Sequence, residues 1–503
     1  MFVVGPAQVA SFGGWSHMIS QFDVAVVGGG VGGLLTATRL AAAGRHVVVL
    51  ERNADLGGKL STRTRDGFSF DTGPSLLTLP ALIDEVFQLA GTSLADEVQL
   101  HRLDPSFRYF WPDATTVTFR DQPIATAEAL EAFSPGAGAQ YLAFLGHARN
   151  IWKISERTFF AGDMASPWSL LRRLRSPRDF TQIDALRTLN ARGKKMFDDP
   201  RLQQWLGRYA TYSGSDPSRS PATLACIAAV EADFGSWYVQ GGLGTLRDAI
   251  VRVAQRVGVE IRTQSEVTGL EATRRRVTGV RLAGEAIAAP VVVVNADAEH
   301  LYRDLLPDTK RLRAVQQTER STSGVAVLVG VDGRTPLIEH HNVWFSRDYA
   351  REFNDISAKR VPSDPTIYGC VSSVTDASQA PAGCENWFLL INTPSDDTIN
   401  ARDVGPWMLE KLAAVGPDLR DRARFAEVIG PRDLAERFRS PGGAIYGTSS
   451  NGRRAAFRRP AMRGPRRGLF LVGGATHPGG GLPLVTLSSR IVTQLILRSH
   501  RQR

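Results

Sequence analysis

The sequence predicts an α/β fold in which one parallel sheet, covered by helices, is assembled from three separate stretches of chain. An apolar strand pattern, a glycine turn and a helix pattern follow one another near the start of the chain. A second strand, a glycine-rich loop and a helix close it. Between them, residues 225–300 alternate between helix and strand patterns. Two blocks of different character interrupt the series, so we expect the sheet domain to be discontinuous.

The first strand is predicted over residues 24–27, an apolar run of the kind that is buried on both faces. Gly28, Gly30 and Gly33 then form a G-x-G-x-x-G turn ahead of a helix expected over residues 31–43. Gly28 allows a tight turn, Gly30 a close approach of backbone to a pyrophosphate, and Gly33 close packing of the helix on the sheet. The pattern therefore predicts a Rossmann-like dinucleotide site, with the phosphates at the helix N-terminus.

The next segment contains an acid and then a second glycine pair. Glu51 follows the strand predicted over residues 47–50, where a carboxylate accepts hydrogen bonds from a ribose and would repel a 2′-phosphate. Gly57, Gly58 and Lys59 come soon after. The glycines bring backbone near an anion and the lysine adds a positive charge, although a solvated surface turn has the same composition. We expect Lys59 beside the diphosphate.

The C-terminal segment indicates which of the possible dinucleotide cofactors is bound. A buried strand is predicted over residues 469–472, and a glycine-rich loop that contains His477 leads into the last helix. Backbone N–H groups of such a loop at a helix N-terminus suit the ribityl chain and the carbonyl edge of a flavin ring. Together with the turn at Lys59, this predicts FAD rather than NAD.

The rest of the chain is divided by pattern. Within residues 225–300 we predict a helix at 243–257, strands at 259–262, 265–270 and 291–294, and an exposed hairpin tip at 274–276. Residues 81–224 are expected to be mostly helical. The predicted division is an N-terminal extension at 1–20, an FAD-binding domain at 21–80, 225–300 and 441–503, and an inserted α+β substrate and membrane-associating domain at 81–224 and 301–440.

Composition restricts the class of protein. The 503 residues include 60 Lys and Arg against 50 Asp and Glu, a net charge of +10 that favours anionic partners such as lipid headgroups. No basic block indicates nucleic acid, and no apolar run of about 18 residues indicates a transmembrane helix. Residues 1–20 make a poor signal peptide. Cys226, Cys370 and Cys384 are scattered, which predicts neither a disulfide framework nor a zinc site and fits a reducing cytosol.

Several motifs support a family resemblance over nearly the whole chain. They are VVGGGVGGL, LGGK with FDTGPS, HHNVWFS, SVTDASQAPAG and VGGATHPGGGLPLVTLSSR. With these motifs the chain resembles the bacterial and fungal phytoene desaturases, within the carotenoid-oxidoreductase and amine-oxidase flavoproteins. The resemblance implies a fold of the glutathione-reductase and amine-oxidase type. It also implies an FAD-dependent enzyme that acts on carotenoids or other polyisoprenoids, in the cytoplasm and peripherally bound to the inner face of the cell membrane.

The resemblance also implies roles for individual residues. Relatives often have arginine where Lys59 stands, which keeps the charge but changes its geometry. The positions implied to meet the ADP part are Gly28, Gly30, Gly33, Glu51 and Lys59, with the backbone of Val267 at the adenine and the loop from Gly474 to Leu484 at the ribityl chain and flavin ring.

The expected reaction is desaturation, in which hydride passes from the polyisoprenoid to flavin N5. Residues 442–460 look more like the subgroup of 3,4-desaturases and terminal-methyl oxidases, so carotenoid oxidation is an alternative. Further alternatives are a cis–trans isomerase or saturase on the same fold, an amine or porphyrinogen oxidase, and a non-enzymatic flavoprotein-like module. The oligomeric state stays open.

Few residues are candidates for catalysis. Loss of hydride leaves a delocalised cation with an acidic neighbouring proton, so a strong base and a metal are not required. His477 is the expected catalytic candidate, as a proton acceptor or a group that tunes the flavin, and its alternative role is to shape the loop by hydrogen bonding. His340 and His341 would face a substrate channel or stabilise a sheet edge.

Two further segments suggest contacts with an apolar substrate. Trp205, Tyr209 and Tyr212 are expected to line a tunnel or to be ordinary core aromatics. Residues 168–180 combine aromatic side chains, leucines and four arginines. This composition predicts an element that rests on anionic lipid, or a solvated amphipathic helix.

Overall fold

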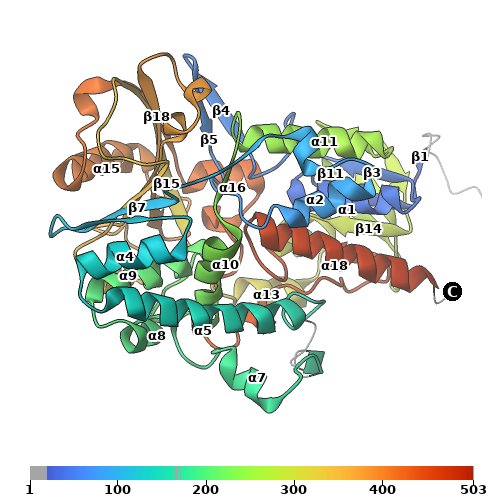
Figure 1. Cartoon of the computed structure of the whole chain (residues 1–503). Helices are drawn as coiled ribbons and strands as arrows, with labels where there is room; N and C mark the ends of the chain where they lie inside the picture. Colours follow the sequence, from blue (N-terminus) through green and yellow to red (C-terminus); the bar gives the residue numbers. More distant parts are fainter. Residues whose placement is uncertain (1–19, 165–167, 170–171, 502–503) are drawn as a thin grey trace, which may run out of the picture.

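The computed structural model describes residues 20–164, 168–169 and 172–501. In Figure 1 the chain forms two halves that lie side by side, each built on its own sheet. A five-stranded sheet with helices α1, α11 and α18 occupies one half, and a seven-stranded sheet with α4, α5, α9 and α15 occupies the other. We call them the cofactor half and the substrate half.

The sheet of the cofactor half is parallel throughout. Its strand order is β10 (Glu260–Arg262), β3 (Val47–Leu50), β2 (Val24–Val27), β14 (Val291–Val294) and β20 (Leu469–Leu471). The strands come from all three of the expected stretches of chain. In β2, β3 and β14 every residue is buried, as predicted from their valine-rich runs, and their bounds agree with the prediction.

Helices and a smaller sheet cover the two faces of this parallel sheet. Helices α1 (Val31–Ala42), α11 (Leu243–Arg256) and α18 (Leu482–Arg501) share one hydrophobic core with it. A second core lies between the parallel sheet and a four-stranded sheet of β1 (Ser20–Gln21), β13 (Ala286–Ala288), β12 (Val277–Leu282) and β11 (Val267–Ala272). The carboxyl ends of β2, β3 and β20 lead directly into the predicted cofactor loops.

The sheet of the substrate half is mixed. Its order is β19 (Ala423–Ile429), β15 (Ser323–Asp332), β18 (Cys384–Thr393), β17 (Ile367–Cys370), β16 (His341–Trp344), β7 (Phe107–Phe110) and β8 (Thr116–Phe119). Strand β7 pairs in parallel with β16, and the other pairings are antiparallel.

One expectation for this half is confirmed and another is wrong. Residues 81–224 are mostly helical, as expected, and also contain the short strands β6, β7 and β8. In residues 107–110 buried and half-buried side chains alternate, which is the period of a strand. A sheet-edge role for His341 is wrong, since β16 has a neighbour on each side.

Helices complete the substrate half. An aromatic-rich core joins β7, β8 and β16 to α4 (Pro123–Phe133), α5 (Ala137–Arg157), α8 (Leu189–Met196), α9 (Pro200–Gly207) and α10 (Cys226–Phe234). On the other face of the sheet lies α15 (Ala401–Val415). The remaining elements are α2 (Ala81–Leu89), α3 (Leu94–Glu97), β4 (Thr62–Arg65), β5 (Phe68–Asp71), β6 (Leu100–Arg102), β9 (Trp237–Val239), α7 (Pro177–Gln182), α12 (Ala298–His300), α13 (Thr309–Gln316), α14 (Tyr349–Ser357), α16 (Pro431–Phe438), α17 (Ala455–Arg458) and several short 3₁₀ and π turns.

Two further expectations concern disulfide bonds and transmembrane helices. Cys226, Cys370 and Cys384 are buried free thiols. Among the helices of the described residues, none has both the length and the hydropathy to cross a bilayer.

Candidate cofactor and substrate site

The glycine turn joins β2 to α1 at the carboxyl end of the parallel sheet. Gly28 has a φ of +98°, a conformation that L side chains rarely adopt. A Cβ on Gly33 would collide with the carbonyl oxygen of Gly28, and one on Gly30 would lie 2.7 Å from Nδ2 of Asn295. The amide of Asn295 also donates to the carbonyl of Gly28 at 3.3 Å. Asn295, which follows β14, is thus a structural partner of the turn that the sequence motif does not include.

The N-terminus of α1 has the properties of an anion site. Within its described surroundings the first turn has neither an acidic residue nor a capping side chain, so its N–H groups are available to a ligand. Glu51 lies beside it, since its carboxylate accepts from the backbone N–H groups of Gly29 and Asn53, each at 2.8 Å. This is the expected end of the site for a ribose.

The second glycine pair lies against the first. The N–H of Gly57 donates to the carbonyl of Gly29 at 2.8 Å, and a Cβ on Gly58 would be 3.2 Å from Cα of Gly30. The side chain of Lys59 turns elsewhere, since its Nζ donates to the carbonyl oxygens of Ala444 at 3.1 Å and Ile445 at 2.6 Å. Burial lowers the pKa of Lys59 to about 8. A contact between Lys59 and phosphate stays a prediction.

A half-buried arginine supports the C-terminal loop. Arg459 donates to the carbonyl oxygens of Tyr446, Thr448 and Gly474 at 2.6–3.0 Å. Its burial lowers its pKa to about 10. The sequence around Arg459 is rich in arginines, so the sequence alone does not show which of them contacts the loop. It fixes the backbone of the loop that is predicted to meet the flavin.

The other predicted cofactor residues lie in the same half. Strand β11 begins at Val267, and the N–H of Ser265 just before it donates to the carbonyl of Glu51 at 2.8 Å. Leu484 is in the first turn of α18, with its Cδ1 3.3 Å from the Cβ position of Gly479. The structure thus brings the start of β11 beside Glu51, and it places Leu484 and Gly474 around one loop. Their contacts with a cofactor stay predictions.

His477 is held by the substrate half. Its Nε2 lies 3.0 Å from the carbonyl oxygen of Phe159, just after α5, and its ring packs edge-on against the Phe159 ring. Burial lowers its pKa to about 4, so the imidazole is neutral at physiological pH. This geometry is that of a hydrogen bond that shapes the loop. A catalytic role for His477 stays a prediction.

A cluster of polar side chains surrounds Asp71, the last residue of β5. Asp71 accepts from the N–H groups of Leu243 at 2.7 Å and Gly244 at 3.3 Å, at the start of α11, and burial raises its pKa to about 6. A small cavity next to it is lined by Asp71, Tyr238 and His340 among others. Asp71 is therefore a buried carboxyl group that can take up a proton near neutral pH.

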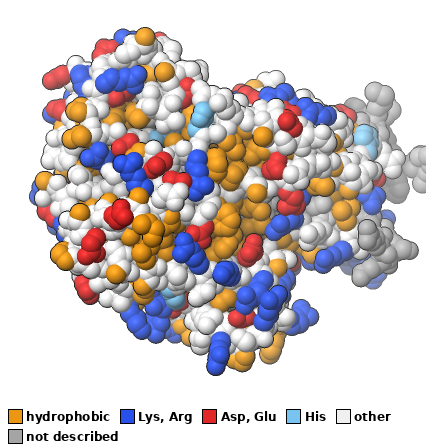
Figure 2. Space-filling model, viewed as in Figure 1, with side chains coloured by type: hydrophobic (Ala, Val, Ile, Leu, Met, Phe, Trp, Pro, Cys, Tyr) orange, Lys and Arg blue, Asp and Glu red, His pale blue; other side chains and the backbone are white. Residues whose placement is uncertain are grey.

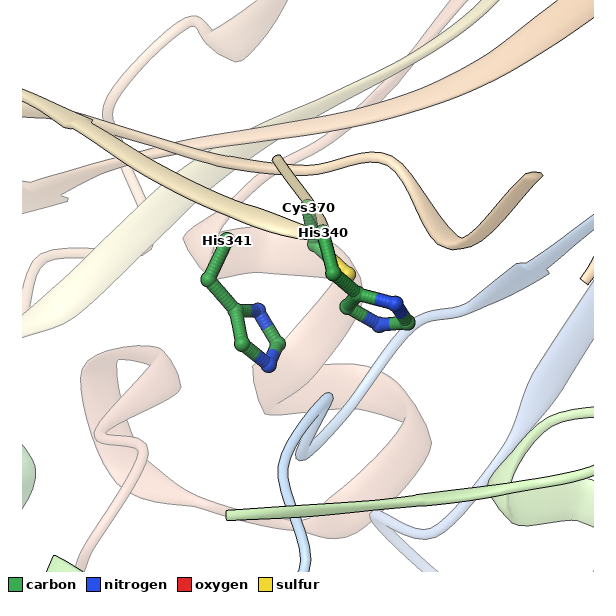
Figure 3. Close-up of side chains that lie close together, drawn as sticks. All are labelled: His340, His341 and Cys370. Carbon is green, nitrogen blue, oxygen red and sulfur yellow. The ribbon is translucent and has the colours of Figure 1, made fainter. Parts of the chain in front are cut away.

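Figure 3 shows His340, His341 and Cys370, whose ligand-type atoms all lie within 4.8 Å of one another. Burial lowers the pKa of His340 to about 3 and raises the pKa of the Cys370 thiol, so all three are neutral. Nδ1 of His341 lies 2.8 Å from the hydroxyl of Tyr368. The cluster could ligate a soft metal ion only after Cys370 loses its proton. The expected lack of a metal stays a prediction.

The aromatic residues of α9 and the turn after it lie in the core of the substrate half. Trp205 is fully buried in the core, and the hydroxyls of Tyr209 and Tyr212 donate to Glu231 at 2.7 and 2.6 Å. In the chain Arg208 comes between Trp205 and the two tyrosines, and its side chain is buried as well. Sequence reasoning considered the aromatics and missed Arg208, although a charged residue within an apolar stretch is a usable signal.

Comparison with known proteins decides the family. A family profile described as flavin containing amine oxidoreductase matches residues 31–497, most of the chain. The chain belongs to the flavin containing amine oxidoreductase family. Its cofactor is FAD, and the chain is an FAD-dependent oxidoreductase. The glycine turn, the uncapped α1 N-terminus and Glu51 fit the ADP part of that cofactor.

Similar proteins fall into two groups. A 4,4'-diapolycopene oxygenase from Methylomonas sp is 34% identical over 94% of this chain and 98% of its own length. A 4,4'-diaponeurosporene oxygenase from Staphylococcus aureus (strain Mu50 / ATCC 700699) is 32% identical over 94% and 97%. Among solved structures, an oxidoreductase from Methanosarcina mazei has a TM-score of 0.62 at 17% identity, covering 94% of this chain and 100% of its own. Cyclohexylamine oxidase from Brevibacterium oxydans IH-35A has a TM-score of 0.62 at 14% identity, covering 95% and 99%. The solved structures support the family's fold.

Proposed function

We propose that this flavoenzyme oxidises a carotenoid at a terminal carbon. The observation that supports this most is the similarity, over 94% of the chain, to proteins named as oxygenases of two carotenoids. The substrate half is consistent with such a ligand, because it is built around aromatic and aliphatic side chains. A long hydrocarbon is bound mainly by burial of apolar surface.

The residues of this chain would bind and orient the reactants. FAD supplies an acceptor for two electrons when it is bound. The glycine turn and α1 would hold its diphosphate, and Glu51 would hold its ribose. Arg459 keeps the C-terminal loop in place. The apolar substrate half would bind the hydrocarbon, and Asp71 can hold a proton at its carboxyl oxygen.

Desaturation of a carotenoid is the second candidate. It is supported by the motifs that the chain shares with phytoene desaturases, above all HHNVWFS and the loop around His477. Both reactions begin with oxidation of an allylic C–H bond, so the cofactor half does not distinguish between them. The difference must come from how the substrate half positions the end of the carotenoid.

We also propose a peripheral contact with the inner face of the cell membrane. Trp168 is 72% exposed and Phe180 40% exposed, and Arg172, Arg175 and Arg178 near them are exposed as well. Residues 170–171 of this segment lie outside the described residues. Figure 2 shows basic side chains at the end of the molecule where Figure 1 places α7, and hydrophobic side chains across the middle of the same face. An exposed aromatic ring among arginines suits an anionic lipid surface.

Expression in cells that make linear carotenoids tests the function. Pigments are separated by chromatography and weighed by mass spectrometry. A product that has gained oxygen supports the proposal, and one that has only lost two hydrogens supports desaturation. An unchanged mass with altered geometry indicates an isomerase. Oxidation of amines by the purified protein, with carotenoids untouched, would refute both candidates.

A further inference from the structure

We propose that Arg208 and the buried polar groups around it form a subsite for the oxygen-bearing end of a polyisoprenoid, an aldehyde or a carboxylate. The inference rests on the proposed function and adds to it, because it concerns a substrate or intermediate that is already oxidised. It starts from a buried charge that the fold and the cofactor do not require.

Arg208 lies in an aromatic cage. Its guanidinium carbon is 4.5 Å from the ring centre of Phe107, 5.5 Å from that of Tyr109 and 5.1 Å from that of Tyr212. Its guanidinium donates hydrogen bonds to the hydroxyls of Tyr109 and Tyr212, both at 3.2 Å. A guanidinium has more N–H donors than these two neutral oxygens can satisfy. The cage therefore holds the cation in place and leaves it able to bind a further acceptor.

Arg208 is linked to a carboxylate through a hydroxyl group. Its guanidinium donates to the hydroxyl of Tyr212, which donates to Glu231. Burial alone would lower the pKa of Arg208, but the nearby tyrosines and Glu231 raise it well above its ordinary value, so the guanidinium stays charged. A buried cation whose direct partners are neutral hydroxyls keeps N–H groups for a further oxygen acceptor, which points to a ligand here.

Two other buried polar atoms near Arg208 lack partners in the described structure. They are Nε2 of His341, whose side chain is fully buried, and the hydroxyl of Tyr349. Both groups interact electrostatically with Arg208. The ring of Tyr349 is also 3.0 Å from the Cβ position of Gly207, the residue before Arg208. Since buried polar atoms are nearly always hydrogen-bonded, two such atoms without partners near a guanidinium with spare N–H donors indicate a common missing partner.

The subsite adjoins the cofactor half through Tyr446. The charge of Arg208 acts on this tyrosine, and its ring lies 2.5 Å from the Cβ position of Gly480 in the predicted flavin loop. Figure 3 shows His341, another member of the subsite, among the strands of the substrate half. An oxygen held by Arg208 would thus be close to the place where the proposed oxidation occurs.

The surroundings identify the class of ligand. A cation with hydroxyl and imidazole neighbours favours an oxygen acceptor over a metal ion. The aromatic walls made by Phe107, Tyr109 and Tyr212 favour a ligand whose remaining body is apolar over a small soluble anion. An aldehyde or carboxylate at the end of a polyene has both properties.

The test compares three polyenes of equal length that end in an aldehyde, a carboxylate or a methyl group. Each is titrated in detergent into FAD-loaded protein, and the dissociation constant is obtained from the shift in polyene absorbance. In Arg208→Met we expect binding of the aldehyde and the carboxylate to weaken about tenfold or more, with the hydrocarbon changed less than about twofold. The ratio of these affinities is not altered by a purely structural role of Arg208.

A milder variant keeps the test valid if Arg208→Met does not fold. Tyr349→Phe removes only the unpartnered hydroxyl, and we expect it to weaken the two oxygenated ligands about threefold to tenfold. Tyr302→Phe is the matched control, because Tyr302 is buried in the core of the cofactor half. Equal weakening of all three ligands, or none, in both subsite variants would overturn the subsite. Failure of wild-type protein to bind any of the three would instead refute the proposed function.

Discussion

The two halves of the molecule differ in how they accommodate charged and polar groups. In the cofactor half, the glycine turn and the N-terminus of α1 leave backbone N–H groups free, and Glu51 is satisfied by neighbouring backbone. In the substrate half, Arg208 is a full charge enclosed by aromatic rings, with orphaned polar atoms beside it. The first arrangement is made by local backbone geometry. The second depends on side chains that the tertiary fold brings together, so the halves should respond differently to substitution.

The largest loss of stability is expected at Gly33, which packs directly against the backbone of Gly28. Gly33→Ala places a Cβ against the carbonyl oxygen of Gly28, which cannot move without opening the turn. We expect a loss of about 3 kcal/mol or more in the free energy of unfolding and loss of bound FAD. Thermal unfolding and flavin absorbance after purification measure both.

A second glycine is the control for this change. Gly146 is on the exposed side of α5, and a Cβ there meets nothing within 4 Å. Gly146→Ala should raise the free energy of unfolding by about 0.5–1 kcal/mol, because it removes flexibility from the unfolded chain. If both variants lose stability alike, the close contact at Gly33 is not the cause.

The next effect concerns cofactor affinity alone. Glu51→Gln removes the charged acceptor beside the turn, and we expect FAD to bind about tenfold more weakly, as measured by fluorescence titration of apoprotein. Glu260→Gln is the matched variant, because Glu260 is exposed on the neighbouring strand β10, where it pairs with Arg262. Unchanged FAD affinity in Glu51→Gln would show that the Glu51 carboxylate does not contribute to FAD binding.

A pH dependence separates Lys59 from surface lysines. Burial lowers its pKa to about 8 in the folded protein, below the ordinary value of 10.5. Between these values the unfolded chain binds more protons, so stability rises with pH from 8 to 10.5, and the Lys59 contribution is constant below that window. The free energy of unfolding of wild type relative to Lys59→Met should therefore increase across the window in urea titrations. Parallel pH profiles would show that the amino group is solvated.

The smallest effect is expected at the membrane. Trp168→Ser should reduce co-sedimentation with anionic vesicles about fivefold, because it removes an exposed aromatic anchor. Leu337→Ser is the control, since Leu337 is 71% exposed and lies in the loop before β16, outside residues 168–180. Equal losses in the two variants would mean that exposure alone, and not the segment at residues 168–180, governs vesicle binding.

The two halves also differ in how far the sequence predicts them. Strands β2 and β14 were predictable to the residue because their valine runs and the glycine turn are local signals. Strand β7 was missed, since it is only four residues long and its partner β16 lies more than 200 residues further along the chain. The same holds for Arg208, whose neighbours Phe107 and His341 come from distant segments. A local pattern cannot show which side chains such long-range pairing brings together.

One measurement tests the central claim most directly. FAD-loaded protein is mixed without oxygen with a linear carotenoid, the flavin absorbance is followed, and the organic phase is analysed by mass spectrometry. We predict that the oxidised flavin band is bleached in proportion to the carotenoid converted, because the terminal carbon gives a hydride to the flavin, takes a hydroxyl group from water and leaves one proton in solution. A flavin that stays oxidised with every carotenoid offered, yet is bleached by an amine, would contradict it.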